Sequence, residues 1–173
     1  MPVLEHDAFV DVRNLSTTDI KRFIEVNAAG NANSKNPHSG MSLLHMAADN
    51  SGNDKVTEVL ISMGADVNAK DNKGGFSPLH IAAMEGNTKI AEILISHGAN
   101  VNAKENNDFT PLHMAAMKEN VEIAKALISH GANVNAKSRI NAKGESYTPL
   151  DLAKQLRRTA MIQYLSSTGG SGR

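Results

Sequence analysis

The sequence lacks cysteine and tryptophan, and its 173 residues include only four phenylalanines and two tyrosines. Without cysteine the chain can form no disulfide bond, and zinc sites built on cysteine thiolates are excluded. No segment approaches the roughly 18 consecutive apolar residues of a membrane-spanning helix. The first residues also lack the apolar run of a secretory signal peptide. We therefore expect a soluble, cytoplasmic protein without membrane insertion; an effector secreted into a host cytosol also fits.

The sequence also has no net charge, because its 18 lysines and arginines balance its 18 aspartates and glutamates. Overall charge thus gives no reason to expect nucleic acid or an anionic membrane as the partner. The balance is uneven along the chain, since residues 137–173 carry seven basic and two acidic residues. This segment fits two interpretations, a solvated basic end or a surface that prefers an acidic partner.

The sequence does contain an internal repeat. Three copies of a run Gly-Ala-Asx-Val-Asn-Ala-Lys lie at 64–70, 98–104 and 131–137. A second motif, Ser/Thr-Pro-Leu-His, alternates with the first at 77–80 and 110–113, with degenerate copies at 42–45 and 148–151. Two motifs that return in fixed phase, 33 residues apart in their best copies, indicate a chain of stacked repeats.

Each motif has a local structural role. The hydroxyl of Thr110 can cap a helix, and Pro111 suits the first helical position because no amide hydrogen is needed there. Apolar residues then return at helical spacing, and Gly131 suits the left-handed end of the second helix. The polar stretch before the next Thr-Pro predicts a hairpin. Each unit is therefore expected to run helix, turn, helix, hairpin.

The two motifs and their period resemble the ankyrin-repeat family over about residues 35–166. The resemblance implies an all-α repeat fold, an ankyrin solenoid of about five stacked helix-turn-helix units with β-hairpin loops, whose end repeats act as caps. We expect a degenerate N-terminal capping repeat at residues 5–38, followed by three ankyrin repeats at 39–71, 72–105 and 106–138. A C-terminal capping repeat with a lengthened hairpin loop is expected at 139–166, and a disordered tail at 167–173. The first helix of the N-terminal cap is expected at residues 5–12.

Seven histidines raise the question of a metal or catalytic site. His45, His80 and His113 occur once per repeat, and the family resemblance implies that each ties a helix start to the neighbouring hairpin. Copies on successive repeats would stand roughly 10 Å apart, too far to share one ion. The sequence has no Gly-x-Ser-x-Gly elbow and no cysteine nucleophile. We therefore expect no metal, no cofactor and no catalysis.

The resemblance also implies that certain positions around each Ser/Thr-Pro-Leu-His motif face a concave groove. Large apolar side chains occupy them: Met41, Phe76, Phe109 and Tyr147 before the motif, Met46, Ile81 and Met114 after its histidine, and Met84 and Met117 one turn on. Polar residues of the hairpins would extend this binding surface: Asn72, Lys73, Asn106, Arg139 and Lys143. A repeated row of aromatic and methionine side chains is typical of adaptable binding surfaces. The alternative is that these side chains pack on their own hairpins.

The leading hypothesis is a monomeric, non-catalytic protein–protein interaction module that holds a protein partner in this groove as an adaptor, inhibitor or effector. The mixed charges of the hairpin tips favour a protein over a polyanion. A second hypothesis gives the basic C-terminal repeat an acidic partner, nucleic acid or anionic lipid. Its contacts would be Lys137, Arg139, Lys143, Lys154, Arg157 and Arg158. A catalytic site hidden in the repeats and a purely structural or self-assembling spacer are the remaining alternatives.

Overall fold

The computed structural model describes residues 16–27, 30–139 and 141–172. Within these ranges the chain forms nine helices and no regular strand. The helices are α1 (Thr17–Asn27), α2 (Leu43–Asp49), α3 (Asp54–Ser62), α4 (Pro78–Glu85), α5 (Thr88–Ser96), α6 (Pro111–Lys118), α7 (Val121–Ser129), α8 (Pro149–Gln155) and α9 (Thr159–Ser167). The helix expected at residues 5–12 lies outside the described residues.

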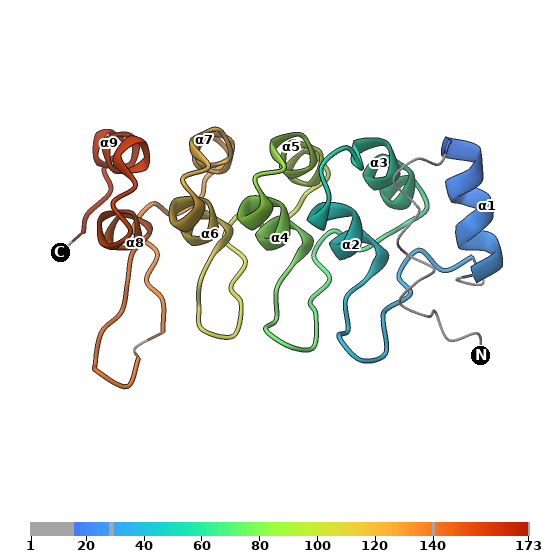
Figure 1. The fold of residues 1–173 in the computed structure, drawn as a ribbon, viewed down its shortest axis with the longest axis horizontal. Helices are drawn as coiled ribbons and strands as arrows, with labels where there is room; N and C mark the ends of the chain where they lie inside the picture. Colours follow the sequence, from blue (N-terminus) through green and yellow to red (C-terminus); the bar gives the residue numbers. More distant parts are fainter. Residues whose placement is uncertain (1–15, 28–29, 140, 173) are drawn as a thin grey trace.

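The helices form two parallel rows with hairpins projecting beside them (Figure 1). The first helices α2, α4, α6 and α8 make one row, and the second helices α3, α5, α7 and α9 make the other. Neighbouring helices pack on each other within each row, and α1 extends the second row by packing on α3. The chain is thus one continuous solenoid, which confirms the repeat architecture predicted from the sequence.

Each first helix begins at its Ser/Thr-Pro motif, or for α2 at Ser42-Leu43, because the residues there pair polar groups at the helix start. Nδ1 of His80 accepts the backbone amide of Ser77 at 3.1 Å and lies 2.8 Å from the Ser77 hydroxyl. The motifs of α2 and α6 make the same contacts. At the start of α8, Asp151 replaces the histidine, and its carboxylate accepts the Thr148 amide and hydroxyl, both at 2.9 Å. The helix starts are therefore encoded locally.

The core alternates small and large side chains. Ala82 and Ala83 on α4 and Ala116 on α6 have no exposed surface, so the first helices can approach one another closely. Larger side chains from the second helices, such as Leu94 and Leu127, fill the space between the rows and are also fully buried. Burial of each such leucine stabilises the fold by about 1.5–3 kcal/mol. The apolar core runs without a break from α1 to α9.

A few backbone bonds close the hairpins, without regular strands. In the second hairpin, the amide of Asp71 donates to the carbonyl of Phe76 at 3.0 Å, and the other three hairpins have an equivalent bond. An isolated antiparallel bridge joins Lys35 and Ser42 in the first hairpin. The expected β-hairpins therefore have hairpin connectivity without strand ladders in the described part of the chain.

The residues that follow α9, where we expected a disordered tail, make hydrogen bonds within the last repeat and to the arm that follows α7. The amide of Gly170 donates to the carbonyl of Leu165 at 2.8 Å, and the amide of Ser171 donates to Oδ1 of Asn135 at 2.7 Å. The same pattern holds the chain after α7, where Asn133 takes the place of Ser171. Backbone groups make these contacts, so a Gly/Ser-rich sequence satisfies them without a recognisable motif.

Candidate functional site

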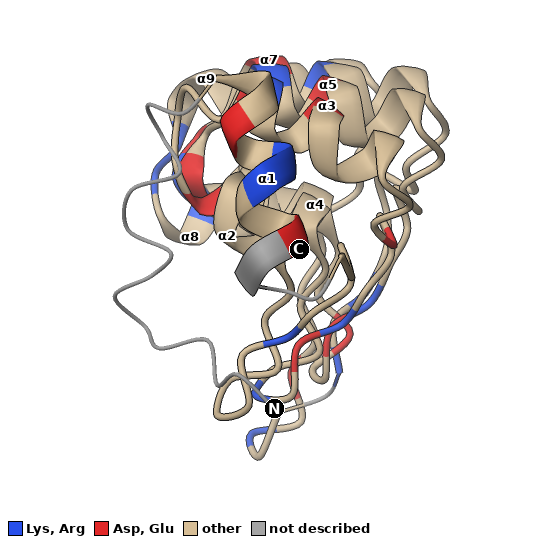
Figure 2. Cartoon of the chain, turned by 90° about the vertical axis from the view of Figure 1, so that its right-hand side faces the viewer, with Lys and Arg blue, Asp and Glu red and all other residues tan. Residues whose placement is uncertain are grey.

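The predicted contact surface lies where the hairpins leave the first helices. An end-on view shows the hairpins extending away from both helix rows, so that each repeat has an L-shaped profile (Figure 2). The residue before each Ser/Thr-Pro motif, or its degenerate copy, is the last residue of a hairpin. This residue therefore lies at the corner where a hairpin meets a first helix, once in each of four repeats.

Two phenylalanine rings at this corner are held in place and remain half-exposed. The ring of Phe76 meets the ring of His80 edge to face, with centroids 5.8 Å apart and an interplanar angle of 85°. Phe109 and His113 repeat the arrangement at 5.3 Å and 80°. Both phenylalanines are partly buried against the core. Such edge-to-face pairs favour one ring orientation, so the exposed part of each ring is presented in a fixed way.

The other large residues of the predicted surface are also half-buried. At the C-terminal end of the corner row, the hydroxyl of Tyr147 donates to the carboxylate of Glu145 at 2.6 Å. Methionines complete the half-buried set: Met41, Met46, Met84 and Met117. The two interpretations of these side chains therefore combine, because each one packs on its own repeat and still keeps exposed surface.

Two residues of the predicted surface prove to be buried. Ile81 is 7% exposed and Met114 is 4% exposed, and both belong to the continuous core. A partner could reach them only if the stack opened. We therefore correct the prediction for these two positions and assign Ile81 and Met114 to the floor beneath the surface.

The polar residues predicted for the hairpin tips are exposed: Asn72, Lys73, Asn106, Arg139 and Lys143. Their hairpins are joined to one another through the backbone. The amide of Asn106 donates to the carbonyl of Gly74 at 2.8 Å, and an equivalent bond joins the first two hairpins. The amide of Arg139 donates to the carbonyl of Asn107 at 2.7 Å. The tips are thus joined to each other while these residues keep exposed surface.

The buried histidines link neighbouring repeats. Nδ1 of His80 accepts a backbone amide, so the ring proton is on Nε2, which donates to the carbonyl of Phe109 at 3.1 Å. His113 donates in the same way to the carbonyl of Tyr147 at 3.0 Å. Burial lowers the pKa of His80 and of His113 to about 4, and it also lowers the pKa of His45. These histidines are neutral links between repeats, as the family resemblance implied.

The basic residues predicted for an acidic partner are partly engaged in the fold. Nε of Arg158 donates to the carbonyl of Met117 at 2.9 Å, which ties the start of α9 to α6. Nε of Arg139 lies 3.8 Å from the carboxylate of Asp108. Positive charge in the last repeat is therefore divided between structural contacts and exposed side chains.

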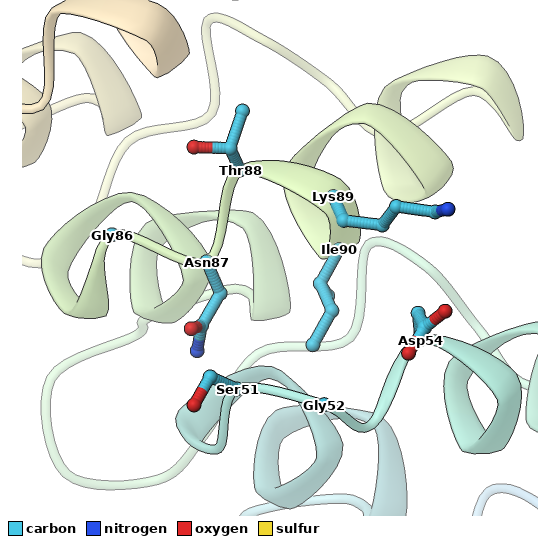
Figure 3. A pocket seen from close by; sticks show the side chains of 8 residues that line it. All are labelled: Ser51, Gly52, Asp54, Gly86, Asn87, Thr88, Lys89 and Ile90. Atoms are coloured by element: carbon cyan, nitrogen blue, oxygen red, sulfur yellow. The ribbon is translucent and has the colours of Figure 1, made fainter.

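The described residues include no cluster of metal-ligating side chains. No group of three or more histidine, aspartate or glutamate side chains among them could hold a metal ion. An open depression lies between the α2–α3 turn and the start of α5 (Figure 3). Its lining includes one carboxylate, Asp54, the hydroxyl residues Ser51 and Thr88, and no histidine. None of the helices in the described ranges has both the length and the apolar character needed to cross a bilayer.

Comparison with models of protein families finds a match to the model described as ankyrin repeats (3 copies), over residues 44–138 and 104–171. The matched segments include all of the helices from α3 to α9. A search of curated proteins gives no match. Ankyrin repeats are in general protein–protein interaction modules. The motifs, the stacked helix pairs and the matched residues agree, and the chain belongs to the ankyrin-repeat family.

Proposed function

We propose that this chain is a non-catalytic interaction module that acts as a monomer and binds a segment of a protein partner across its hairpins and first helices. The observation that carries the proposal is a row of large side chains, one at the same corner of each of four repeats. We call it the contact row; it consists of Met41, Phe76, Phe109 and Tyr147. The polar tip residues would surround this row and give the partner hydrogen bonds.

Fixed presentation supports a binding role. Phe76 and Phe109 are oriented by their histidines, and the backbone bonds between hairpins hold the spacing of the row. Association therefore orders few additional side chains, which lowers the entropic cost of binding. Half-exposed aromatic and methionine side chains also have apolar area left to bury against a partner, at about 25 cal/mol per Å². Both effects favour a partner segment that runs along the stack and crosses several repeats.

A double variant, Phe76→Ala with Phe109→Ala, tests the proposal. Affinity capture from a cell extract with the intact chain would supply the partner, and titration calorimetry would then compare affinities. We expect the double variant to bind at least about 30-fold more weakly, since aromatic anchors commonly contribute more than 1 kcal/mol each. Its helical circular dichroism should remain, because both residues lie outside the helices.

The matched control removes apolar surface from the row of second helices, which does not include the contact row. Ile61 on α3 and Ile128 on α7 are half-buried and pack on the same core. The Ile61→Ala, Ile128→Ala variant should keep the affinity of the intact chain within about twofold, since half-buried side chains outside a contact surface contribute little to binding. Unchanged affinity in the phenylalanine variant would remove the contact row from the binding surface.

A further inference from the structure

A second repeated row lies on the other arm of each hairpin, the arm that follows the second helix. It consists of one lysine per repeat, at the end of each Gly-Ala-Asx-Val-Asn-Ala-Lys motif or of the degenerate copy Ala-Gly-Asn-Ala-Asn-Ser-Lys at residues 29–35. We call it the lysine row: Lys35, Lys70, Lys104 and Lys137. All four side chains are exposed. Figure 2 shows basic residues along the hairpins, below the helix rows.

Neighbouring repeats hold this row in register. Nζ of Lys35 donates to the carbonyl of Lys70 at 3.0 Å, and Nζ of Lys70 donates to the carbonyl of Lys104 at 2.7 Å. A carbonyl takes one of the three ammonium protons and leaves the positive charge in place. The row is therefore a line of cations with a fixed spacing, and their ammonium groups keep N–H donors for a ligand.

Acidic residues of the same hairpins are used to close the hairpins. Asp71 accepts the amides of Gly74 and Phe76 at 3.1 and 2.9 Å. Glu105 is 5% exposed and accepts two amides of its own hairpin at 2.7 and 3.0 Å. Their carboxylates thus turn toward the hairpin backbone, whereas the lysines remain at the surface.

Two other carboxylates lie close to the row. Asp108 is 3.6 Å from Nζ of Lys104, and this ion pair is partly exposed. Asp66, on the same arm as Lys70, accepts the amide of Asn68 at 2.9 Å. Among the residues that the structure describes, Lys35, Lys70 and Lys137 form no ion pair. The row consequently keeps most of its positive charge.

We propose that the lysine row binds an acidic protein segment in the polyproline II conformation, with a carboxylate at every third residue. Packed helices are about 8–10 Å apart, and the lysines repeat with the helices. A polyproline II segment has three residues per turn and rises about 3.1 Å per residue, so every third side chain lies on one face at about 9 Å intervals. A β-strand does not match, because its same-face side chains are about 7 Å apart. Charge and spacing therefore select the same occupant.

A labelled twelve-residue probe peptide of four Glu-Pro-Pro units tests this inference by fluorescence anisotropy at low salt. Its control has the same composition, with the four glutamates placed together. We expect the spaced peptide to bind the intact chain about fivefold or more tightly than the clustered one, and its affinity to fall as salt is added. Replacing all four lysines of the row by glutamine should weaken binding of the spaced peptide about tenfold, the scale of a few exposed ion pairs.

A charge-matched control variant replaces four exposed lysines of the helices or their ends, Lys21, Lys55, Lys89 and Lys118, by glutamine. It should bind the spaced peptide within about twofold of the intact chain if binding depends on the row and not on total charge. The Phe76→Ala, Phe109→Ala variant should also bind it normally, because the lysine row is separate from the contact row. If the fourfold row variant loses helical signal, Lys70→Gln with Lys137→Gln takes its place, with about a threefold loss expected.

Three results would overturn the proposal. The first is equal affinity for the spaced and clustered peptides, which would show that spacing has no role. The second is an equal loss of binding in the row variant and the charge-matched control, which would indicate nonspecific attraction. The third is tighter binding of an oligothymidylate of equal charge than of the spaced peptide, which would assign the row to nucleic acid.

Discussion

The ring of His80 makes two contacts that both depend on its protonation state. Nδ1 must accept the amide of Ser77, and Nε2 must donate to the carbonyl of Phe109. If Nδ1 were protonated, it would be a donor facing the Ser77 amide, which is also a donor, and this buried hydrogen bond would be lost. His113 is in the same position between Thr110 and Tyr147. The link between repeats therefore requires a neutral ring, and burial maintains it by lowering the pKa to about 4.

We expect acid to destabilise the protein before its carboxylates titrate. In the unfolded chain His80 and His113 have a pKa of 6.5, and in the folded protein burial lowers it to about 4. The unfolded state therefore binds more protons between these values, so stability is complete above pH 6.5 and falls as the pH drops toward 4. The loss should be about 2 kcal/mol per histidine near pH 5. Urea unfolding at about pH 7.5 and about pH 5 would measure it.

Histidines outside the core supply the control for this prediction. His97 and His130 are exposed at the ends of α5 and α7. A variant with both replaced by glutamine should lose as much stability in acid as the intact chain. If its stability instead became independent of pH, the acid response would belong to the exposed rings and the prediction would fail.

Whole hairpins are joined by asparagine side chains that bridge consecutive repeats. Nδ2 of Asn102 donates to the carbonyl of Gly131 at 3.0 Å, and its Oδ1 accepts the amide of Asn133 at 2.8 Å. Asn135 holds the segment after α9 with the same pair of contacts, and its Oδ1 accepts the amide of Ser171 at 2.7 Å. One amide side chain thus satisfies both a donor and an acceptor of the next repeat.

Replacing either asparagine by alanine should loosen only the segment that it holds. In Asn135→Ala we expect the Ser171 amide to exchange with solvent about tenfold faster, the effect of one lost hydrogen bond. The Asn133 amide should be unchanged there, and Asn102→Ala should give the reverse pattern. Amide exchange followed by NMR would measure both. Equal exchange of Ser171 in Asn135→Ala and in the intact chain would show that this contact does not hold the segment.

The sequence predicted the contacts that form between residues close in the chain better than those that depend on neighbouring repeats. The motif around Thr110 and His113 acts within a few residues, so it predicted helix starts and the links between repeats. The burial of Ile81 and Met114 was missed, because the family resemblance indicates which positions lie toward the groove but not how much of each side chain neighbouring residues cover. The contacts of Ser171 were not predicted, because they use backbone groups that the composition of the segment does not reveal.

At the scale of the whole molecule, all the extensive helix–helix contacts of the described residues lie within a repeat or between adjacent repeats. In such a stack, stability is approximately a sum of terms for single repeats and for their interfaces. Repeats with a neighbour on each side should open less often than repeats at the ends. Phe76 and Phe109 precede α4 and α6, which have packed first helices on both sides. The central part of the contact row therefore lies in the most strongly supported region.

Two equivalent leucines test this view. Leu94 on α5 and Leu165 on α9 occupy the same place in their helices and are both fully buried. Replacing either by alanine should cost about 2–5 kcal/mol of local stability. In Leu94→Ala we expect faster amide exchange in every helix, because the variant weakens the interfaces on both sides of α5. In Leu165→Ala faster exchange should be confined to α8, α9 and the segment after them, and partner binding through Phe76 and Phe109 should persist. Hydrogen exchange with mass spectrometry would measure both variants. If exchange in the Leu165→Ala variant became faster by the same factor in α4 and in α9, the stack would open only as one unit. The rigidity of the contact row would then depend on the whole chain.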